Sequence, residues 1–579
     1  MGFDFPTACG GLRDALFAGS VLLPVLAGAA GAPSTSAAGP GHDPDTAADA
    51  IAGRAPPAKA PVAPGPAIVP LHPNAAAGLA RPYAGVKIDV TTYHYDNLRT
   101  GWNATETELT QASVKGAKFG LLQTLKVDGH VYAEPLLVSS FRMPDASVHD
   151  ILVVATAHDS VYAFDAQTYA QLWRVGLGTS QSSAHIGCGD VTPEYGIAAT
   201  PVIVRGGPGK ATVYVVALTE PTANEFHTTL HALDLADGSD VKAPVEISPS
   251  AQLSDGSTLS YDPKDQWARA GLTWANDTVY VAISSRCDHN AGNISGWMLR
   301  YNQKLALVDA FHTIETTAGF KLATFWGGGF APAVDTDGTL FGVTGNGNFS
   351  KGGKDWGESV LHLPANLKKV TDFFTPDAYA RLNGADLDFG SGGVMLLPPV
   401  EGQTAPPLAV AMGKDAVAYL LSRTSLGKSK PGDTGALQAL RVAGSGAGVW
   451  GGPAYFLSPT GGVVYYQNSG GPMRAYAVAT GSTPSLTQFA TGTTTASQGG
   501  STPIVSSSGS AVGTGVVWTI RRGNPMALEA YDAEHLGAPI FSAAAGAWTA
   551  GRPFQTPMQA NGRVYVPGSG TVTVFGLTP

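Results

Sequence analysis

Residues 161–173 read Val-Tyr-Ala-Phe-Asp-Ala-Gln-Thr-Tyr-Ala-Gln-Leu-Trp, and this stretch constrains the fold more than any other. Its β-branched and aromatic residues favour a half-buried strand on either side of a turn. The short polar side chains of Asp165 and Thr168 favour the turn itself. Weaker copies follow at intervals of about 45–70 residues to the C-terminus, and repetition on this scale predicts a repeat architecture.

Each copy belongs to a unit of extended runs in a fixed order. A first strand that often follows a proline, as in Glu134–Val138, precedes a more apolar strand such as Ile151–Ala155. A third strand, here Val161–Phe164, and an outer strand, here Leu172–Val175, complete most units. Eight such units predict an all-β, eight-bladed β-propeller of four-stranded antiparallel blades.

The eighth unit ends after its third strand and lacks an outer one. The extended run Phe119–Val127 precedes the first unit and has the composition of such a strand. We expect this N-terminal strand to complete the last blade, because pairing the two ends closes the ring and removes an exposed sheet edge.

The turn motif resembles the repeat of PQQ-type propellers, the fold of quinoprotein alcohol dehydrogenases. That repeat reads Ala-x-Asp-x-x-Thr-Gly with a Trp a few residues later. In the first unit Ala163, Asp165, Thr168 and Trp173 match, and Tyr169 replaces the Gly. The resemblance extends over about residues 90–579. Over this range the chain also resembles exported bacterial proteins known only as PQQ-like repeat proteins. It implies the fold and the compartment but no reaction.

The cofactor of those dehydrogenases is not implied for this chain. Their site carries a vicinal Cys-Cys disulfide, a stacking Trp, a Glu/Asn/Asp set on calcium and an Asp base. This sequence has no Cys-Cys pair, and no other residue of that set can be aligned. We therefore expect a binding or scaffold propeller. The alternative is a PQQ- and calcium-dependent oxidoreductase with divergent site residues, and a polysaccharide hydrolase or lyase is a third, weaker interpretation.

The N-terminal part of the chain predicts export. Leu16–Ala32 is apolar and ends in small residues, which is typical of a signal peptide. We therefore assign residues 1–32 to a signal peptide, 33–85 to a disordered Ala/Pro-rich linker and 86–579 to the propeller. This division places the protein in the periplasm or outside the cell, and no other apolar run is long enough to span a membrane.

The chain has three cysteines, Cys9, Cys188 and Cys287, and cleavage of the signal would remove the first. The other two lie in predicted loops on the same face of adjacent blades. In an exported protein we expect a disulfide between them, with two buried thiols as the alternative. No Cys-x-x-Cys occurs, so no metal site is predicted.

The candidate site lies on one face of the propeller. The loops that connect second to third strands and the loops that enter each blade open on that face, around the central channel, and concave faces of this kind bind ligands. The polar and aromatic candidates in these loops are His158, Asp159, Glu194, Arg269, Trp326, Asn346, Asp388, Lys414, Trp450 and Arg521.

Several of these residues also have a structural interpretation. Asp386 and Asp388 can bind calcium or merely shape their loop. Trp326 and Trp450 can stack on a ligand or pack between blades. His158 and Asp159 can act as a base and its orienting partner, or Asp159 can shape a turn.

We expect a monomer that binds a small molecule, or an envelope or extracellular protein, at the channel face. Lys414 and Arg521 can supply positive charge for an anionic ligand. The net charge is −9 and no stretch is strongly basic, so a nucleic acid partner is not expected.

Overall fold

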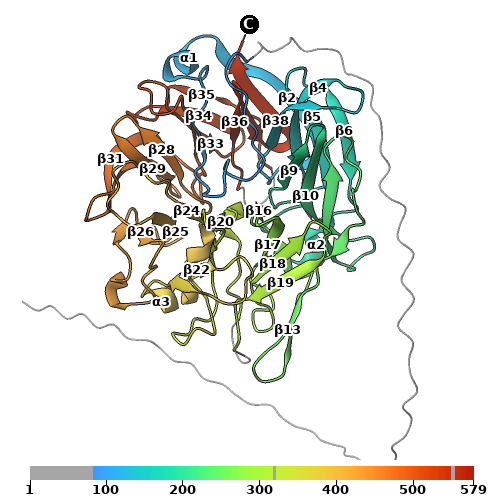
Figure 1. Ribbon diagram of the computed structural model, residues 1–579, viewed down its shortest axis with the longest axis vertical. Coiled ribbons are helices and arrows are strands. Elements are labelled where there is room, and N and C mark those ends of the chain that lie inside the picture. Colours follow the sequence, from blue (N-terminus) through green and yellow to red (C-terminus); the bar gives the residue numbers. More distant parts are fainter. Residues whose placement is uncertain (1–82, 317–320, 550–553, 579) are drawn as a thin grey trace, which may run out of the picture. The chain divides into compact units, whose positions relative to one another are not determined.

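In the computed structural model, residues 83–316, 321–549 and 554–578 are described. The predicted signal peptide lies outside these residues, as does the predicted linker apart from residues 83–85. Within residues 83–578, eight antiparallel sheets follow one another around a ring (Figure 1). The predicted eight-bladed β-propeller is therefore confirmed.

The blades are numbered in chain order, and each runs from its first strand to its outer strand. The first four blades comprise these strands: blade 1, β3 Leu136–Arg142, β4 Val148–Ala155, β5 Ser160–Asp165 and β6 Gln171–Gly176; blade 2, β9 Val202–Gly207, β10 Lys210–Thr219, β11 His227–Asp234 and β12 Val245–Glu246; blade 3, β15 Gln266–Ala268 and β16 Thr273–Ala275, then β17 Thr278–Ser285, β18 Trp297–Asn302 and β19 Leu307–His312; blade 4, β20 Ala333–Val334, β21 Leu340–Val343, β22 Val360–Leu363 and β23 Asp372–Phe374.

The second half of the ring follows the same order. Its strands are these: blade 5, β24 Val394–Leu396, β25 Leu408–Met412, β26 Val417–Ser422 and β27 Gln438–Arg441; blade 6, β28 Ala454–Ser458, β29 Gly461–Gln467, β30 Pro472–Ala479 and β31 Ser485–Thr495; blade 7, β32 Ile504–Ser506, β33 Val516–Arg521, β34 Ala527–Asp532 and β35 Phe541–Ala544; blade 8, β36 Met558–Ala560, β37 Arg563–Pro567, β38 Ser569–Leu577 and β2 Phe119–His130.

Few elements lie outside the blades. They are the strand β1 Trp102–Asn103, the short pair β7 Gln181–Ser182 and β8 Glu194–Tyr195, the hairpin β13 Ser250–Gln252 and β14 Thr258–Ser260, the helices α1 Gln111–Lys115, α2 Ser183–Ile186 and α3 Tyr379–Gly384, and three 3₁₀ turns at Gly327–Gly329, Phe389–Ser391 and Pro431–Asp433. In the described ranges, none of the helices has the length and apolar character that crossing a membrane requires.

The ring closes as the sequence predicted. β2 pairs antiparallel with β38, with Phe119 opposite Leu577 and Leu125 opposite Val572. The outer strand of blade 8 thus comes from the N-terminal side of the chain, while its other three strands come from the C-terminal side. The pairing consequently covers the edge that β38 would otherwise expose where the two ends of the ring meet.

The turn motif of blade 1 joins two blades. The Asp165 carboxylate accepts hydrogen bonds from the backbone N–H groups of Gln167 and Thr168 and from the Thr168 hydroxyl. Tyr169 takes a left-handed φ of 64° at the position where the repeat carries Gly. The indole N–H of Trp173 donates to the Leu235 carbonyl of blade 2 at 2.9 Å, so this side chain contacts the neighbouring blade.

A segment ahead of the blades, Val90–Asn103, forms a hub at the centre of the ring. It hydrogen-bonds to the first strand of every blade, which shows that these strands all face the same centre. The partners in blade order are Leu137, Ile203, Trp274, Val334, Leu396, Tyr455, Val505 and Gln559. Its last two residues form β1, which runs parallel to β32 of blade 7.

Arg99 is the most extensively bonded side chain of this hub. It is fully buried, and its guanidinium donates to the Pro332 carbonyl through both Nε and Nη2. The remaining hydrogen bonds reach the Thr273 hydroxyl of blade 3 and the Thr92 hydroxyl, Tyr93 carbonyl and Asp96 carbonyl of the hub. Burial lowers the pKa of Arg99 to about 10, so the side chain remains charged at neutral pH.

We predict that Arg99→Ala lowers the free energy of unfolding by at least about 3 kcal/mol, because the carbonyls of Tyr93, Asp96 and Pro332 lose a charged donor. Chemical denaturation followed by tryptophan fluorescence measures this change. Arg142→Ala serves as the control, since Arg142 is exposed on β3. Equal effects of the two substitutions would contradict the assigned role of Arg99.

Two titratable groups, His94 of the hub and Glu134 beside it, respond to pH in opposite directions. Burial raises the pKa of Glu134 to about 8, although the backbone N–H of His94 donates to its carboxylate at 2.9 Å. Burial lowers the pKa of the His94 imidazole to about 4. Glu134 therefore stabilises the fold while protonated, and this contribution is lost as the pH rises from about 4.5 to 8. The contribution of His94 is lost as the pH falls from about 6.5 to 4, so only Glu134 acts above pH 6.5.

We predict that Glu134 makes stability fall by about 1.4 kcal/mol per pH unit between pH 6.5 and 8. Glu134→Gln removes the ionisation and should flatten the profile across this window. Denaturation midpoints at half-unit pH steps measure the slope, and Glu401→Gln, at an exposed position, is the control. A Glu134→Gln protein with the wild-type slope would show that Glu134 ionises normally.

Candidate functional site

A cleft of about 320 Å³ lies among the loops of six blades. Its lining residues are Asp190 and Val191 of the loop that enters blade 2, Trp267, Arg269, Ser284, Ser285, Cys287 and Asp288 of blade 3, Trp326 of blade 4, Asp386, Asp388 and Lys414 of blade 5, Trp450 of blade 6 and Phe554 of blade 8. Because these blades are spread around the ring, the cleft lies near its centre. Most of the lining residues belong to the loops from which the sequence predicted a site.

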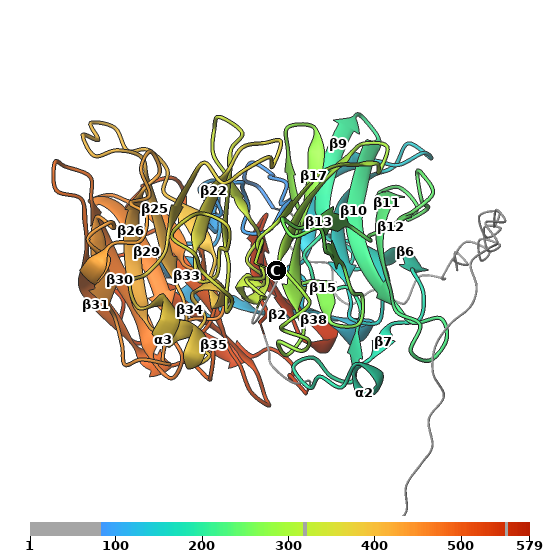
Figure 2. The same cartoon turned by 90° about the horizontal axis from the view of Figure 1, so that it is seen from below.

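These loops open on one end of the strands. In the view of Figure 2, α2 and α3 lie toward the lower ends of the sheets, and both belong to loops that enter a blade. The loop of α2 leads to Cys188, and the loop of α3 leads to Asp386 and Asp388.

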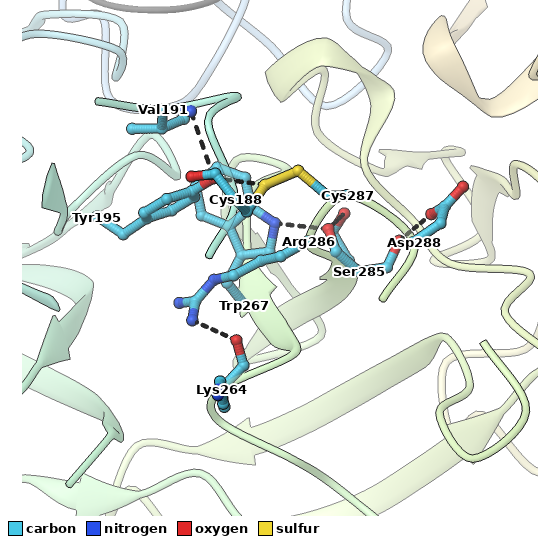
Figure 3. Close-up of a disulfide and its surroundings, with 10 residues drawn as sticks. Cys188, Val191, Tyr195, Lys264, Trp267, Ser285, Arg286, Cys287 and Asp288 are labelled. Carbon is cyan, nitrogen blue, oxygen red and sulfur yellow. Dashed lines mark hydrogen bonds between the residues drawn. A yellow bond between two sulfur atoms is a disulfide. The ribbon is translucent and has the colours of Figure 1, made fainter. Parts of the chain in front are cut away.

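The predicted disulfide is present at the edge of the cleft. Cys188 and Cys287 are joined with a Cα–Cα distance of 5.8 Å, and they are 99 residues apart in sequence (Figure 3). The bond links the loop that enters blade 2 to the loop between β17 and β18 of blade 3. It therefore fixes the spacing of two loops on one side of the cleft.

A buried arginine, Arg286, directly precedes Cys287 of the disulfide and packs against two aromatic rings. The Arg286 guanidinium lies 4.9 Å from the ring centre of Tyr195 and 5.8 Å from that of Trp267 (Figure 3). It donates to the carbonyls of Pro263 and Lys264. The Trp267 indole N–H in turn donates to the Ser285 carbonyl at 2.8 Å, which holds this ring as part of the cleft wall.

Aromatic rings form much of the opposite wall. The Phe554 ring lies 6.1 Å from Trp326, edge to face, and 6.0 Å from Trp450. Gly328 has a positive φ of 61° and packs closely against the backbone of Trp450. A Cβ atom at position 328 would lie 2.5 Å from the carbonyl carbon of Trp450. The close approach of these two loops brings Trp326 and Trp450 to the same cleft.

Charged groups lie beside the aromatic wall. The Lys414 ammonium is 2.8 Å from Asp386 Oδ1 and 2.6 Å from Asp388 Oδ2, and it lies 5.6 Å from the ring centre of Trp326. Burial by itself lowers the pKa of Lys414, but its two carboxylate partners outweigh this effect and raise it. Burial raises the pKa of Asp388 to about 6, against the opposing effect of Lys414. Near neutral pH the cleft therefore contains a buried Lys–Asp ion pair.

A second layer of oxygen atoms lies behind Asp388. The backbone N–H of Asn346 donates to Asp388 Oδ1 at 2.7 Å, and its side-chain amide donates to Asp288 and Asp386. Glu358 is fully buried and accepts from the Phe389 N–H at 2.6 Å, and burial together with the Asp388 charge raises its pKa well above the usual range. Within the described residues, Asn346 Oδ1 and Glu358 Oε1 accept no hydrogen bond.

Arg269 reaches the cleft because the first strand of blade 3 is interrupted. β15 and β16 each pair with β17, and residues 269–272 between them leave the ladder. The Arg269 guanidinium donates to the Ala198 carbonyl at 3.2 Å and to the Gly328 carbonyl at 3.0 Å. Its guanidinium lies 5.2 Å from the ring centre of Phe554. Burial lowers its pKa to about 10, so it keeps its charge.

The structure brings together five of the ten candidates: Arg269, Trp326, Asp388, Lys414 and Trp450. Asn346 lies directly behind them. His158 and Glu194 lie outside the cleft lining and pair with each other at 2.9 Å. Asp159 is buried in the β4–β5 turn, where it accepts from the Leu218 N–H, and Arg521 pairs with Glu529 at 2.9 Å.

Trp267, Asp288 and Phe554 also line the cleft but were not among the ten candidates. Asp288 lies in a loop between second and third strands, a class that the sequence had marked as facing the channel, whereas Trp267 lies in the short strand β15 at the entry of blade 3. Phe554 directly precedes the run Gln555-Thr556-Pro557 that leads into β36, and this proximity to a first strand was the available signal.

In the described ranges, a single group of three His, Cys, Asp or Glu residues has its ligand atoms close enough to share a metal ion, namely Cys188, Asp190 and Cys287. Both cysteine sulfurs of this group are already joined to each other in the disulfide. The group therefore lacks free thiolates for a metal.

No protein-family model and no curated protein match the sequence. Among solved structures, the chain is similar to a europium-containing methanol dehydrogenase, with a TM-score of 0.56, 13% identity and coverage of 84% of this chain and 98% of that one. The quinohemoprotein alcohol dehydrogenase of Comamonas testosteroni has a TM-score of 0.56 and 14% identity, and the match covers 84% of this chain and 80% of that one. Quinohemoprotein alcohol dehydrogenase ADHIIG of Pseudomonas putida HK5 has a TM-score of 0.57 and 13% identity, and the match covers 84% of this chain and 80% of that one.

At such low identities, these matches establish the fold alone. The chain has the PQQ-like, quinoprotein-type propeller fold, as its repeat predicted. The activities of the three dehydrogenases do not follow from this likeness.

Proposed function

We propose that this protein is an exported propeller that binds a small molecule in the cleft at the centre of its loop-bearing face. The observation that carries the proposal is the convergence of Trp267, Trp326, Trp450 and Phe554 with a buried Lys414–Asp388 pair, from loops of separate blades. Ligand sites are typically concave, lined by aromatic side chains and provided with a few fixed polar groups. The volume of about 320 Å³ lies at the small end of the usual range.

The lining indicates the chemistry of the ligand. Trp326 and Trp450 offer ring faces and edges on which a planar or sugar ring packs. Lys414 and its carboxylate partners offer a donor and acceptors within about 3 Å of one another, which suits hydroxyl groups. We therefore infer a hydroxylated ring compound as the ligand class.

Export is part of the proposal. The disulfide supports it, because such bonds persist in oxidising compartments and are rare in the cytosol. A periplasmic or extracellular location also agrees with the predicted signal peptide, which remains a prediction.

We predict that a panel of monosaccharides and hydroxylated aromatic compounds contains members that change tryptophan fluorescence in a saturable way. Trp326→Ala should weaken the binding of such a compound by at least about tenfold, since stacking contacts contribute about 0.5–1.5 kcal/mol beyond area burial. Trp274→Ala is the control, because Trp274 packs against Tyr214 within the blades. Binding that survives Trp326→Ala and Trp450→Ala unchanged would place the ligand elsewhere.

The second candidate function is a PQQ- and calcium-dependent oxidoreductase. The observation that favours it is the set of oxygen atoms on Asp388, Asn346 and Glu358, two of which accept no hydrogen bond from the described chain. Calcium takes carboxylate and amide oxygens of this kind, so these residues would hold it. Lys414 already pairs with Asp388, and calcium would have to compete with its ammonium group. The quinone, when bound, would accept electrons from an alcohol.

We predict that purified protein mixed with PQQ and Ca²⁺ shows no dye-linked oxidation of alcohols, because Lys414 already pairs with Asp388, one of the carboxylates that the metal needs. Absorbance of the quinone and reduction of the dye measure binding and turnover separately. If PQQ instead binds stoichiometrically and alcohol is oxidised, and if Asp388→Asn abolishes that oxidation, the protein is an oxidoreductase and the proposed binding function is wrong.

A further inference from the structure

Buried polar atoms without partners gather near the cleft, where loops of blades 7, 8 and 1 meet. Within the described residues, Arg522 Nε and Nη2, the Tyr132 hydroxyl and the Trp548 indole N–H form no hydrogen bond. Their exposed fractions are 4%, 2% and 7%, respectively, so solvent does not replace the missing partners. Leaving buried donors unpaired is costly, and such groups usually have a partner in the functional state.

Contacts link the three segments that carry these residues. The Trp548 ring lies 4.9 Å from the Tyr132 ring, edge to face. The Trp548 backbone N–H donates to the carbonyl of Gly523, the residue next to Arg522, at 3.3 Å. The side-chain amide of Gln555 contacts Met526 Sδ of the same loop at 3.5 Å, and Gln555 Oε1 is another atom that has no partner among the described residues.

A second buried guanidinium adds positive charge to this region. Arg269 lies 5.8 Å from the Tyr132 ring centre, and its hydrogen bonds go to carbonyl groups. Arg522 uses only Nη1, which donates to the Gln498 carbonyl at 3.2 Å. Burial, and next the charge of Arg269, lower the pKa of Arg522 to about 9. Across the described chain, neither guanidinium has a carboxylate within ion-pair distance, although both remain charged at neutral pH.

The geometry points to an oxyanion-binding subsite formed by Arg522, Tyr132 and Trp548, with Arg269 as a second positive charge. The free groups are mostly donors, so an acceptor with negative charge satisfies them together. A guanidinium binds carboxylate, phosphate and sulfate oxygens through its forked donors, and such charge-assisted bonds are strong where water is excluded. This inference goes beyond the proposed function, because none of the three residues Arg522, Tyr132 and Trp548 lines the cleft.

The test titrates the full-length protein with sodium acetate, sodium phosphate and sodium sulfate at an ionic strength held constant with sodium chloride. Calorimetry and the thermal midpoint report binding. We expect a saturable response to at least one of the three anions, and the anion that gives it identifies the oxyanion class. No saturable response to any of them would overturn the proposal.

Variants locate the site. Arg522→Gln should weaken binding by at least about tenfold, because it removes a charged donor pair. Arg142→Gln, at an exposed position, should leave the affinity unchanged. Equal affinity of the wild type and Arg522→Gln would refute the assignment.

Tyr132→Phe keeps the aromatic packing and should weaken binding by a few-fold, so the proposal stays testable if Arg522→Gln does not fold. Crystals soaked in selenate provide a readout independent of affinity. Anomalous density against Arg522 Nε and Nη2 supports the subsite, and selenate bound only at other positions contradicts it.

Discussion

The hydrogen bonds between the hub segment Val90–Asn103 and the first strand of every blade are the constraint on which the rest of the structure depends. Each blade contributes a different backbone or side-chain partner, and Arg99 ties the hub to blades 3 and 4 through a fully buried guanidinium. One short segment thereby fixes the position of eight sheets about a common centre. The loops that form the cleft depend on this arrangement, because they either enter a first strand or connect the second and third strands of the same blades.

The surroundings of the cleft bury charge beside apolar blades. Arg269, Arg522, Asp388 and Glu358 are buried there, and Lys414 keeps only 13% of its side chain exposed. Arg99 and Glu134 at the hub are buried as well, so burial alone does not distinguish the cleft. Buried charges are expensive unless they are paired, and a buried charge that the chain leaves without a counter-charge indicates a requirement other than folding. Lys414 and Asp388 neutralise each other within the chain. Arg522 has no such counter-charge among the described residues.

The sequence was sufficient to predict the fold, because the turn motif of Asp165 and Trp173 recurs with the same strand order and local patterns repeat in every blade. Ring closure by β2 and the Cys188–Cys287 disulfide were also predictable from the order of strands and loops. The site was predictable only in part, since loops on one face differ in length and direction. Arg269 reaches the cleft through a break in a strand, whereas Arg521 turns to Glu529, and neither outcome is encoded in a periodic pattern. The hub shows no repeat at all, which explains why its role was missed.

Closure of blade 8 has a consequence for how the protein reaches its folded state. The Thr578 hydroxyl donates to the Lys118 carbonyl across 460 residues of sequence, beside the pairing of β2 with β38. A ring of this topology cannot be completed while the chain is still being synthesised, because the partner of β2 emerges last. Until then, β2 presents an unpaired edge and the hub lacks some of its blades. Such a chain remains open until β38 is available to pair with β2.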